Sequence, residues 1–319
     1  MKSSFPVFYS GLFLEHDTGV GHPENAGRLT AVFEHLKACQ KSELKDDEWA
    51  RNIHWLTPAD RDVLRYVERV HNSDYVKALE AFCLSGGGQL DSDTVVSAKS
   101  YDLALLAVAA WLDGVDWVWK EKTCGFALVR PPGQHAERDR GMGFCLLSNA
   151  AIAAHYALTL PEINRVAIFD WDVHHGNGTQ ALVSENASIV YCSFHQSPAY
   201  PGTGAASERG HHQNVLNIPM SPGSVLADYQ RLWSEQVQPF FTDFDADLML
   251  VSAGYDATQA DPLAQICLQP QDYAWLTASC LALTPTVLFG LEGGYDYGAL
   301  AEAVAATIRT ACAGLPDVV

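Results

Sequence analysis

The stretch DWDVHHGNGTQ, residues 170–180, places two carboxylates and two imidazoles within six residues, directly after the apolar run VAIF. If that run is a strand, side-chain alternation sends Asp170, Asp172 and His174 to one side. Buried carboxylates are costly unless a cation accompanies them, and the stretch contains no Lys or Arg. Aspartate oxygens and a histidine nitrogen suit zinc with an open catalytic position. The alternative is a hydrogen-bonded cap on the helix that GNGTQAL begins, and this stretch alone does not decide between the two.

Three further apolar runs also end in polar groups. DLMLVSAG is followed by Tyr255 and Asp256, TVLFGLEGG by Tyr295, and GFALV by a loop with Gln134 and His135. The carboxyl ends of parallel strands share one edge of a sheet, so these groups are expected to meet there. Asp256 could then be a third metal ligand, His135 a general base and Tyr295 a hydroxyl donor to an oxyanion. Each residue alone also fits ordinary packing or a loop, but four convergent strand ends favour a catalytic site.

The elements that would position these groups alternate along the chain. Short β-rich runs predict strands at 6–10, 125–129, 166–170, 189–194, 215–220, 247–254 and 286–294. Helical periodicity predicts helices at 24–39, 60–69, 73–84, 97–120, 146–159, 224–241, 270–284 and 298–313. Such alternation is typical of an α/β fold with a parallel sheet covered by helices on both faces. No repeat or flexible linker interrupts it, and residues 1–319 are interpreted as one domain.

Charge and cysteine content restrict the partners and the compartment. The formal net charge is -18, which argues against nucleic acid as a partner and favours cationic ligands. The eight scattered cysteines include no C-x-x-C pair and indicate reduced thiols. The amino terminus lacks a signal-peptide pattern, and no apolar stretch is long enough for a membrane span. We therefore expect a cytoplasmic protein without a membrane partner; a homo-oligomer is compatible with the sequence, which leaves the oligomeric state open.

Five motifs together resemble a known family. They are RPPGQHAERDRGMGFCLLSNAAIAA, DWDVHHGNGTQ, SFHQSPAYPGTG, SAGYDATQADPLA and LEGGYD, and the similarity runs in order from about residue 7 to residue 312. The pattern is similar to the zinc-dependent histone deacetylase superfamily. Trp171, Asn177 and the segment HDTGVGHPENAGRL look more like class II and bacterial histone deacetylase-like amidohydrolases than class I. The resemblance implies an arginase-like three-layer α/β sandwich around an eight-stranded, mainly parallel sheet.

Carried over by position, the resemblance implies the parts of a hydrolytic site. Asp172, His174 and Asp256 would bind one Zn²⁺, with room for water and the carbonyl of an acetylated lysine or another acylated amine. His135 would take a proton from the water and return it to the leaving amine. Tyr295 would stabilise the oxyanion. Amide hydrolysis needs these three functions whatever the family: a polarised carbonyl, an activated water and a proton for the departing nitrogen.

The resemblance also implies roles around this centre. Phe144 and Tyr200 would flank the substrate tunnel, which suits a neutral acyl-lysine stem better than a charged ammonium, and the Gly143 carbonyl would accept from the substrate amide. Arg28 would lie near an internal acetate exit. Asp170, His174 and Ser193 would form part of a structural site for K⁺ or Na⁺. The acidic pair Asp91 and Asp93 aligns loosely with the rim that holds the substrate backbone, and solvated turn residues are an equal alternative.

Two positions depart from the pattern. Gln134 stands where the family has the first of two adjacent histidines, and a glutamine amide can hydrogen-bond to a metal-bound water but cannot hold a proton. Activity is expected to be retained through His135, slowed or with a shifted pH optimum; the alternative is a protein that binds acylated ligands without turnover. Leu263 stands where polyamine-selecting relatives can carry a glutamate, which disfavours, without excluding, acetylpolyamines or other small metabolites. A ureohydrolase is disfavoured by the single-metal ligand set and by Tyr295.

Overall fold

A computed structural model describes residues 4–314 of the chain. Its centre is an eight-stranded sheet in the order β2-β1-β5-β10-β9-β6-β7-β8, in which every pairing is parallel. The strands are β1 Phe5–Phe8, β2 Ile53–Leu56, β5 Cys124–Ala127, β6 Val166–Asp170, β7 Ile189–Gln196, β8 Val215–Met220, β9 Leu248–Ala253 and β10 Val287–Leu291. The three-layer architecture expected from the sequence is confirmed.

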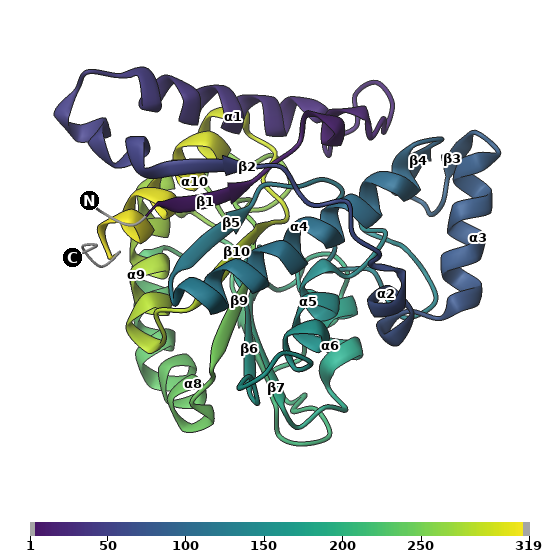
Figure 1. Cartoon of the computed structure of the whole chain (residues 1–319). Helices are drawn as coiled ribbons and strands as arrows, with labels where there is room; N and C mark the ends of the chain where they lie inside the picture. The colour runs from purple at the N-terminus through teal and green to yellow at the C-terminus, as the bar shows by residue number, and fades with distance from the viewer. Residues whose placement is uncertain (1–3, 315–319) are drawn as a thin grey trace.

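Helices cover both faces of the sheet (Figure 1). One layer is built on α4 Ser100–Glu121 and α5 Asn149–Ala157, with α2 Leu64–Val70, α3 Ser73–Leu84 and α6 Asn177–Val183. The other contains α1 Ala26–Lys41, α10 Tyr297–Ala313, α9 Tyr273–Leu283, α8 Gln238–Phe244 and α7 Leu226–Leu232. None of the helices in residues 4–314 is long and apolar enough to cross a membrane.

Burial explains why the central strands read as continuous apolar runs. All residues of β5, β6, β9 and β10 are buried, as expected for strands covered on both faces. The helix α4 lies so close to β10 that a Cβ on Gly290 would stand 1.8 Å from the Trp111 ring. Six of the eight cysteines are buried.

Several short elements were missed or misjudged at the sequence level. The strand β2 has only four residues, two of them half-buried, and forms the sheet edge, so its alternation is weak. The hairpin of β3 Gly87–Gln89 and β4 Val95–Ser97 was not predicted. The predicted helix at 224–241 is interrupted by a π-helical turn at Trp233–Val237, between α7 and α8.

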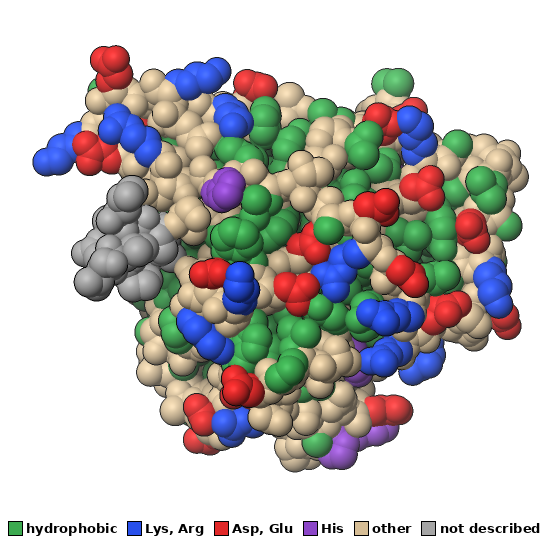
Figure 2. All heavy atoms as spheres, in the orientation of Figure 1, with side chains coloured by type: hydrophobic (Ala, Val, Ile, Leu, Met, Phe, Trp, Pro, Cys, Tyr) green, Lys and Arg blue, Asp and Glu red, His purple; other side chains and the backbone are tan. Residues whose placement is uncertain are grey.

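Figure 2 shows acidic and basic side chains interspersed over the face that α4 occupies in Figure 1.

Candidate active site

Four neighbouring strands bring the predicted groups to one edge of the sheet. The order β5-β10-β9-β6 places the loops after these strands side by side, and all four run in the same direction. Gln134 and His135 follow β5, Asp172 and His174 follow β6, Asp256 follows β9, and Tyr295 follows β10. The carboxyl edge of a parallel sheet is where α/β proteins bind ligands.

A buried triad lies at the centre of this edge. Single ligand atoms of Asp172, His174 and Asp256 all lie within 4.8 Å of one another. The Nδ1 atom of His174 lies 3.2 Å from Asp172 Oδ1 and 3.2 Å from Asp256 Oδ2. Both carboxylates are fully buried, and within residues 4–314 neither forms an ion pair with Lys or Arg.

The charge of the triad favours a bound cation. Burial disfavours a charged imidazole, but the two carboxylates outweigh it and raise the pKa of His174 to about 10. When both carboxyl groups are ionised, the three side chains carry one net negative charge even with His174 protonated, and a metal ligand must be neutral imidazole. Two carboxylate oxygens and one imidazole nitrogen at this spacing fit a divalent metal with an open position.

Two glycines make room for the carboxylates. A Cβ on Gly254 would lie 2.0 Å from Asp172 Oδ2, and one on Gly293 would lie 2.1 Å from Asp256 Oδ2. Without those side chains, the Gly293 N–H donates to Asp172 Oδ2 at 2.8 Å, and the Val173 N–H donates to Asp256 Oδ1 at 2.9 Å. These bonds orient each carboxylate while leaving lone pairs for a cation.

His135 is held as a neutral imidazole beside the triad. Burial, together with the neighbouring His174, lowers the pKa of His135 to about 4. Its Nδ1 lies 2.8 Å from Asn177 Oδ1, and the amide nitrogen of Gln134 lies 3.4 Å from its Nε2. A neutral, buried imidazole with one fixed nitrogen is the form that a general base requires.

Gln134 itself makes few side-chain bonds. Its Oε1 is buried and has no hydrogen-bond partner within the described residues. Asp170 accepts from the Tyr191 hydroxyl at 2.9 Å and from the Asp172 N–H at 3.1 Å. Burial raises the pKa of Asp170 well above the ordinary value. Gln134 lines the pocket, where a bound molecule could provide a partner for this oxygen.

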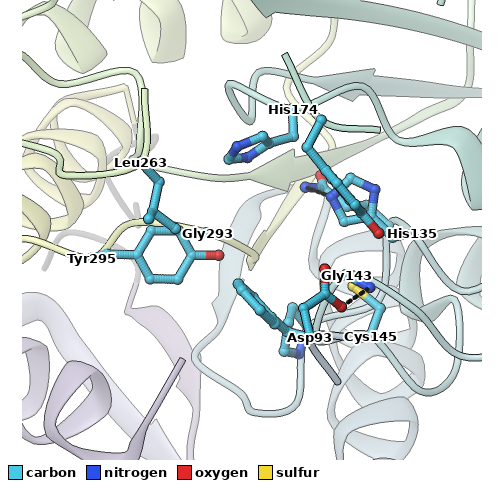
Figure 3. A pocket seen from close by; sticks show the side chains of 12 residues that line it. Asp93, His135, Gly143, Cys145, His174, Leu263, Gly293 and Tyr295 are labelled. Atoms are coloured by element: carbon cyan, nitrogen blue, oxygen red, sulfur yellow. Dashed lines mark hydrogen bonds between the residues drawn. The ribbon is translucent and has the colours of Figure 1, made fainter. Parts of the chain in front are cut away.

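Tyr295 lies on the opposite side of the pocket. Figure 3 shows its hydroxyl directed toward the space below His174 and beside His135. The Tyr295 N–H donates to Asp261 Oδ2 at 2.7 Å, and the Arg28 guanidinium carbon lies 5.0 Å from the centre of its ring. Burial raises the pKa of Tyr295 well above the ordinary value although Arg28 opposes the shift. The hydroxyl therefore stays protonated and able to donate.

A cavity of about 220 Å³ leads to these groups. Phe144 packs edge-on against Tyr295 at 5.9 Å between ring centres, and Tyr200 packs edge-on against His135 at 5.1 Å. The mouth includes Leu263, which is 43% exposed. The cavity is lined by Asp93, Pro132, Gln134, His135, Gly143, Phe144, Cys145, His174, Tyr200, Leu263, Gly293 and Tyr295.

The Gly143 backbone lies against the base and the rim. Its φ is +56°, and a Cβ would meet the His135 ring at 2.6 Å, so glycine is required there. The Gly143 N–H donates to Asp93 Oδ1 at 3.2 Å (Figure 3). Of the loosely aligned acidic pair, Asp93 lines the pocket, whereas Asp91 is not among the lining residues and accepts from the Ser92 N–H.

The remaining predicted residues lie behind the pocket. Arg28 is fully buried and donates to the carbonyls of Gly294 at 2.6 Å and Glu292 at 2.5 Å. It is not among the residues that line the cavity. Ser193 is paired in register with Asp170 across β6 and β7, and its hydroxyl lies 3.0 Å from His195 Nδ1.

Several contributors to the site had no assigned role in the sequence interpretation. Asn177 was read only as a marker of similarity, although it immediately follows the HHG segment and its oxygen faces His135. Asp261 holds the Tyr295 backbone, and Glu292 accepts from the Gly133 N–H. The motifs LEGG and ADPL contained these carboxylates, but their partners lie more than 30 residues away in the chain.

Comparisons with known proteins identify relatives of this chain. The model of the histone deacetylase domain matches residues 22–311. An uncharacterised protein of Synechocystis sp. is 50% identical over 305 residues, covering 95% of this chain and 98% of the relative. The histone deacetylase-like amidohydrolase of Pseudomonas aeruginosa is 36% identical over 276 residues, covering 84% and 70%.

A solved structure shows the same fold. The crystal structure of the HDA15 HD domain superposes with a TM-score of 0.90 at 32% identity, covering 98% of this chain and 88% of that one. The chain belongs to the histone deacetylase family.

Proposed function

We propose that this chain is a zinc-dependent amidohydrolase that removes acetyl groups from lysine side chains or similar N-acetylated amines, as one catalytic domain. The observation that carries the proposal is that one cavity is lined by His174 of the candidate metal triad, the neutral imidazole of His135 and the protonated phenol of Tyr295. In this proposal Asp172, His174 and Asp256 hold the metal. A bound Zn²⁺ would polarise the acetyl carbonyl and make water nucleophilic near neutral pH.

The protein side chains supply the rest of the chemistry. His135 takes a proton at Nε2, because Nδ1 is committed to Asn177, and delivers it to the departing amine. Tyr295 donates its hydroxyl proton in a hydrogen bond to the oxygen that gains charge, a contribution of about 100-fold to 1,000-fold for a single donor. Phe144 and Tyr200 present apolar ring faces to the acyl-lysine stem and exclude water.

Three secondary assignments belong to the same proposal. Asp170, His174 and Ser193 would contribute to a structural K⁺ or Na⁺ site, a role supported by the full burial of Asp170 without a basic partner within residues 4–314. The Gly143 carbonyl would accept from the substrate amide. Arg28, which contacts the face of Tyr295, would lie near the route by which acetate leaves.

The test is acetate release by the zinc-loaded protein from an acetyl-lysine peptide and from acetylspermidine. Turnover of the peptide is expected, with Tyr295→Phe slower by about 100-fold or more. Tyr297→Phe is the matched control, because Tyr297 is an exposed tyrosine only two residues away. Faster turnover of acetylspermidine would select a polyamine deacetylase instead.

A second candidate is a protein that binds acylated ligands with little turnover. It is favoured by one observation, the buried and unpartnered Gln134 Oε1, since an amide cannot exchange protons as the expected histidine would. Zinc and peptide binding without acetate release, repaired by Gln134→His, would establish it.

A further inference from the structure

Glu292 is a fully buried carboxyl group with no assigned role in the proposed chemistry. It follows β10 directly and precedes Gly293. Within the described residues its side chain forms no ion pair, because Arg28 donates to its backbone carbonyl instead. Burying an acid without a cation costs free energy, so the residue requires an explanation in its contacts.

Each oxygen of Glu292 reaches a different strand end. Its Oε2 accepts from the Gly133 N–H at 2.7 Å and from the Gln134 N–H at 3.3 Å, in the loop after β5. Its Oε1 accepts from the Ser252 hydroxyl at 3.2 Å, on β9. One side chain therefore joins the segment that carries His135 to the two strands that lead to Asp256 and Tyr295.

The Gly133–His135 segment depends on backbone contacts. The Gln134 side chain does not anchor it, since its Oε1 has no partner and its nitrogen makes only the 3.4 Å contact with His135. From the α6 side, the Thr179 N–H donates to the Gln134 carbonyl at 3.0 Å. From the β10 side, the described contacts to its N–H groups come from Glu292. Without Glu292 the N–H groups of Gly133 and Gln134 would lose this acceptor.

We propose that Glu292 is a positioning residue, which holds the Gly133–His135 segment against β9 and β10 and so fixes His135 relative to the Asp172–His174–Asp256 triad. The inference rests on the proposed deacetylase function. A displacement of about 1 Å in a catalytic group can cost about 100-fold in rate, which is the scale of effect expected here.

The hydrogen bonds of Glu292 do not need a negative charge. Burial raises the pKa of Glu292 to about 8, so the neutral acid is well populated near pH 7. A proton on Oε1 can be donated to the Ser252 hydroxyl while Oε2 still accepts from both N–H groups. A glutamine has the same outline: its carbonyl can accept from the two N–H groups and its NH₂ can donate to Ser252.

This equivalence gives a matched pair of variants. Glu292→Gln retains both kinds of contact and should keep kcat within about threefold, whereas Glu292→Met fills the space without acceptors and should lower kcat about 100-fold. For both, KM for an acetyl-lysine peptide and bound zinc should stay within about threefold, because the rings that flank the substrate stem and the metal ligands are unaltered. Thermal unfolding checks that each variant folds.

A second measurement of the positioning role does not depend on turnover. In the metal-free protein, the His135 ring nitrogens, assigned with His135→Ala, report the tautomer and environment of the base by ¹⁵N NMR. Glu292→Gln should leave these resonances in place and Glu292→Met should shift them, while the His211 and His212 resonances stay unchanged as internal controls. If the native protein releases no acetate, the deacetylase proposal fails, and this measurement still decides whether Glu292 positions His135.

The proposal is overturned if Glu292→Met keeps native kcat and native His135 resonances. It is also overturned if Glu292→Gln loses as much activity as Glu292→Met, because the role would then belong to the charge. If Glu292→Met does not fold, Glu292→Asp is measured in its place, because an aspartate is one methylene shorter and cannot reach both strand ends. A loss of about tenfold in kcat would support the positioning role, and native kcat would exclude it.

Discussion

The Nδ1 atom of His135 lies 2.8 Å from the side-chain oxygen of Asn177. The orientation of that amide is fixed, because its nitrogen donates to Glu137 Oε1 at 2.7 Å. An amide oxygen only accepts, so His135 carries its proton on Nδ1 and its lone pair on Nε2, which lies 3.4 Å from the Gln134 amide nitrogen. Asn177 therefore holds His135 in one tautomer. Because the amide is neutral, it favours the imidazolium less than a carboxylate would.

The first prediction concerns Asn177→Asp. A carboxylate beside His135 favours the charged imidazole and should raise its pKa from about 4 by about 1 unit or more. His135 must be unprotonated at Nε2 to act as a base, so activity is lost as pH falls through this pKa. The low-pH limb of kcat/KM should therefore move to higher pH. Asn164→Asp, at an exposed site, is the control for added charge. If the low-pH limb of kcat/KM does not move in Asn177→Asp, the assignment of His135 as the base is contradicted.

Gln134→His is expected to increase kcat. A Cβ added at Gly176 would lie 2.3 Å from Asp170 Oδ2 and 3.4 Å from the Gln134 Cβ, so position 134 lies close to that carboxylate. An imidazole there can share a proton with Asp170 and assist the reaction, an effect of about 100-fold at the low end for acid-base groups. Asp170→Asn should remove the gain in the double variant. Rates equal to the native rate would show that Gln134 already suffices.

The sequence predicted the positions of the central elements well for a physical reason. The run at β6 was placed with the observed bounds, because a parallel strand buried on both faces is a continuous apolar segment. The edge strand β8 was also placed with the observed bounds, although its Pro219 is exposed. The edge strand β2 and the β3–β4 hairpin are short and half-exposed, so their patterns are weak. The eighth strand was expected only from the family resemblance.

Convergence of the candidate site could also be predicted, but not its internal contacts. A common edge of a parallel sheet was enough to bring His135, His174, Asp256 and Tyr295 together. The partners of these groups depend on loop geometry that no local pattern encodes: Asn177 turns its oxygen to His135, and Glu292 spans 159 residues to reach Gly133. The catalytic roles of these residues stay predictions.

Glu24→Gln should destabilise the fold strongly. Glu24 is fully buried between Arg28, which donates at 3.0 Å, and Arg130, which donates at 2.7 Å. Burial alone would raise its pKa, but the two guanidinium groups hold the pKa well below the ordinary value. Removing one partner of a buried ion pair costs about 3 to 5 kcal/mol, measurable by urea unfolding at pH 7.

The pH dependence of that loss follows from the lowered pKa. A depressed carboxyl pKa contributes stability above the unfolded value of about 4.5, and this contribution is lost as pH falls below it. The difference between the native protein and Glu24→Gln should therefore shrink in acid. Glu235→Gln, which breaks an exposed pair with Arg231, should cost less than about 1 kcal/mol. A similar small cost for Glu24→Gln would mean that the buried cluster is not a structural support.

Leu263→Glu should change substrate preference toward acetylated polyamines. Leu263 is at the mouth of the cavity, its N–H donates to Asp261 Oδ1 at 2.9 Å, and its side chain is 43% exposed. A carboxylate there can pair with a second ammonium of acetylspermidine, whereas an acetyl-lysine peptide with neutral flanks gains nothing. Partly exposed ion pairs contribute up to about 1 kcal/mol, so the ratio of kcat/KM values should shift about fivefold. The shift should weaken with salt, since screening reduces the attraction.

Leu84→Glu, on a more exposed leucine of α3 that does not line the cavity, controls for the added negative charge. An equal shift in both variants would assign the effect to net charge and not to the mouth of this pocket.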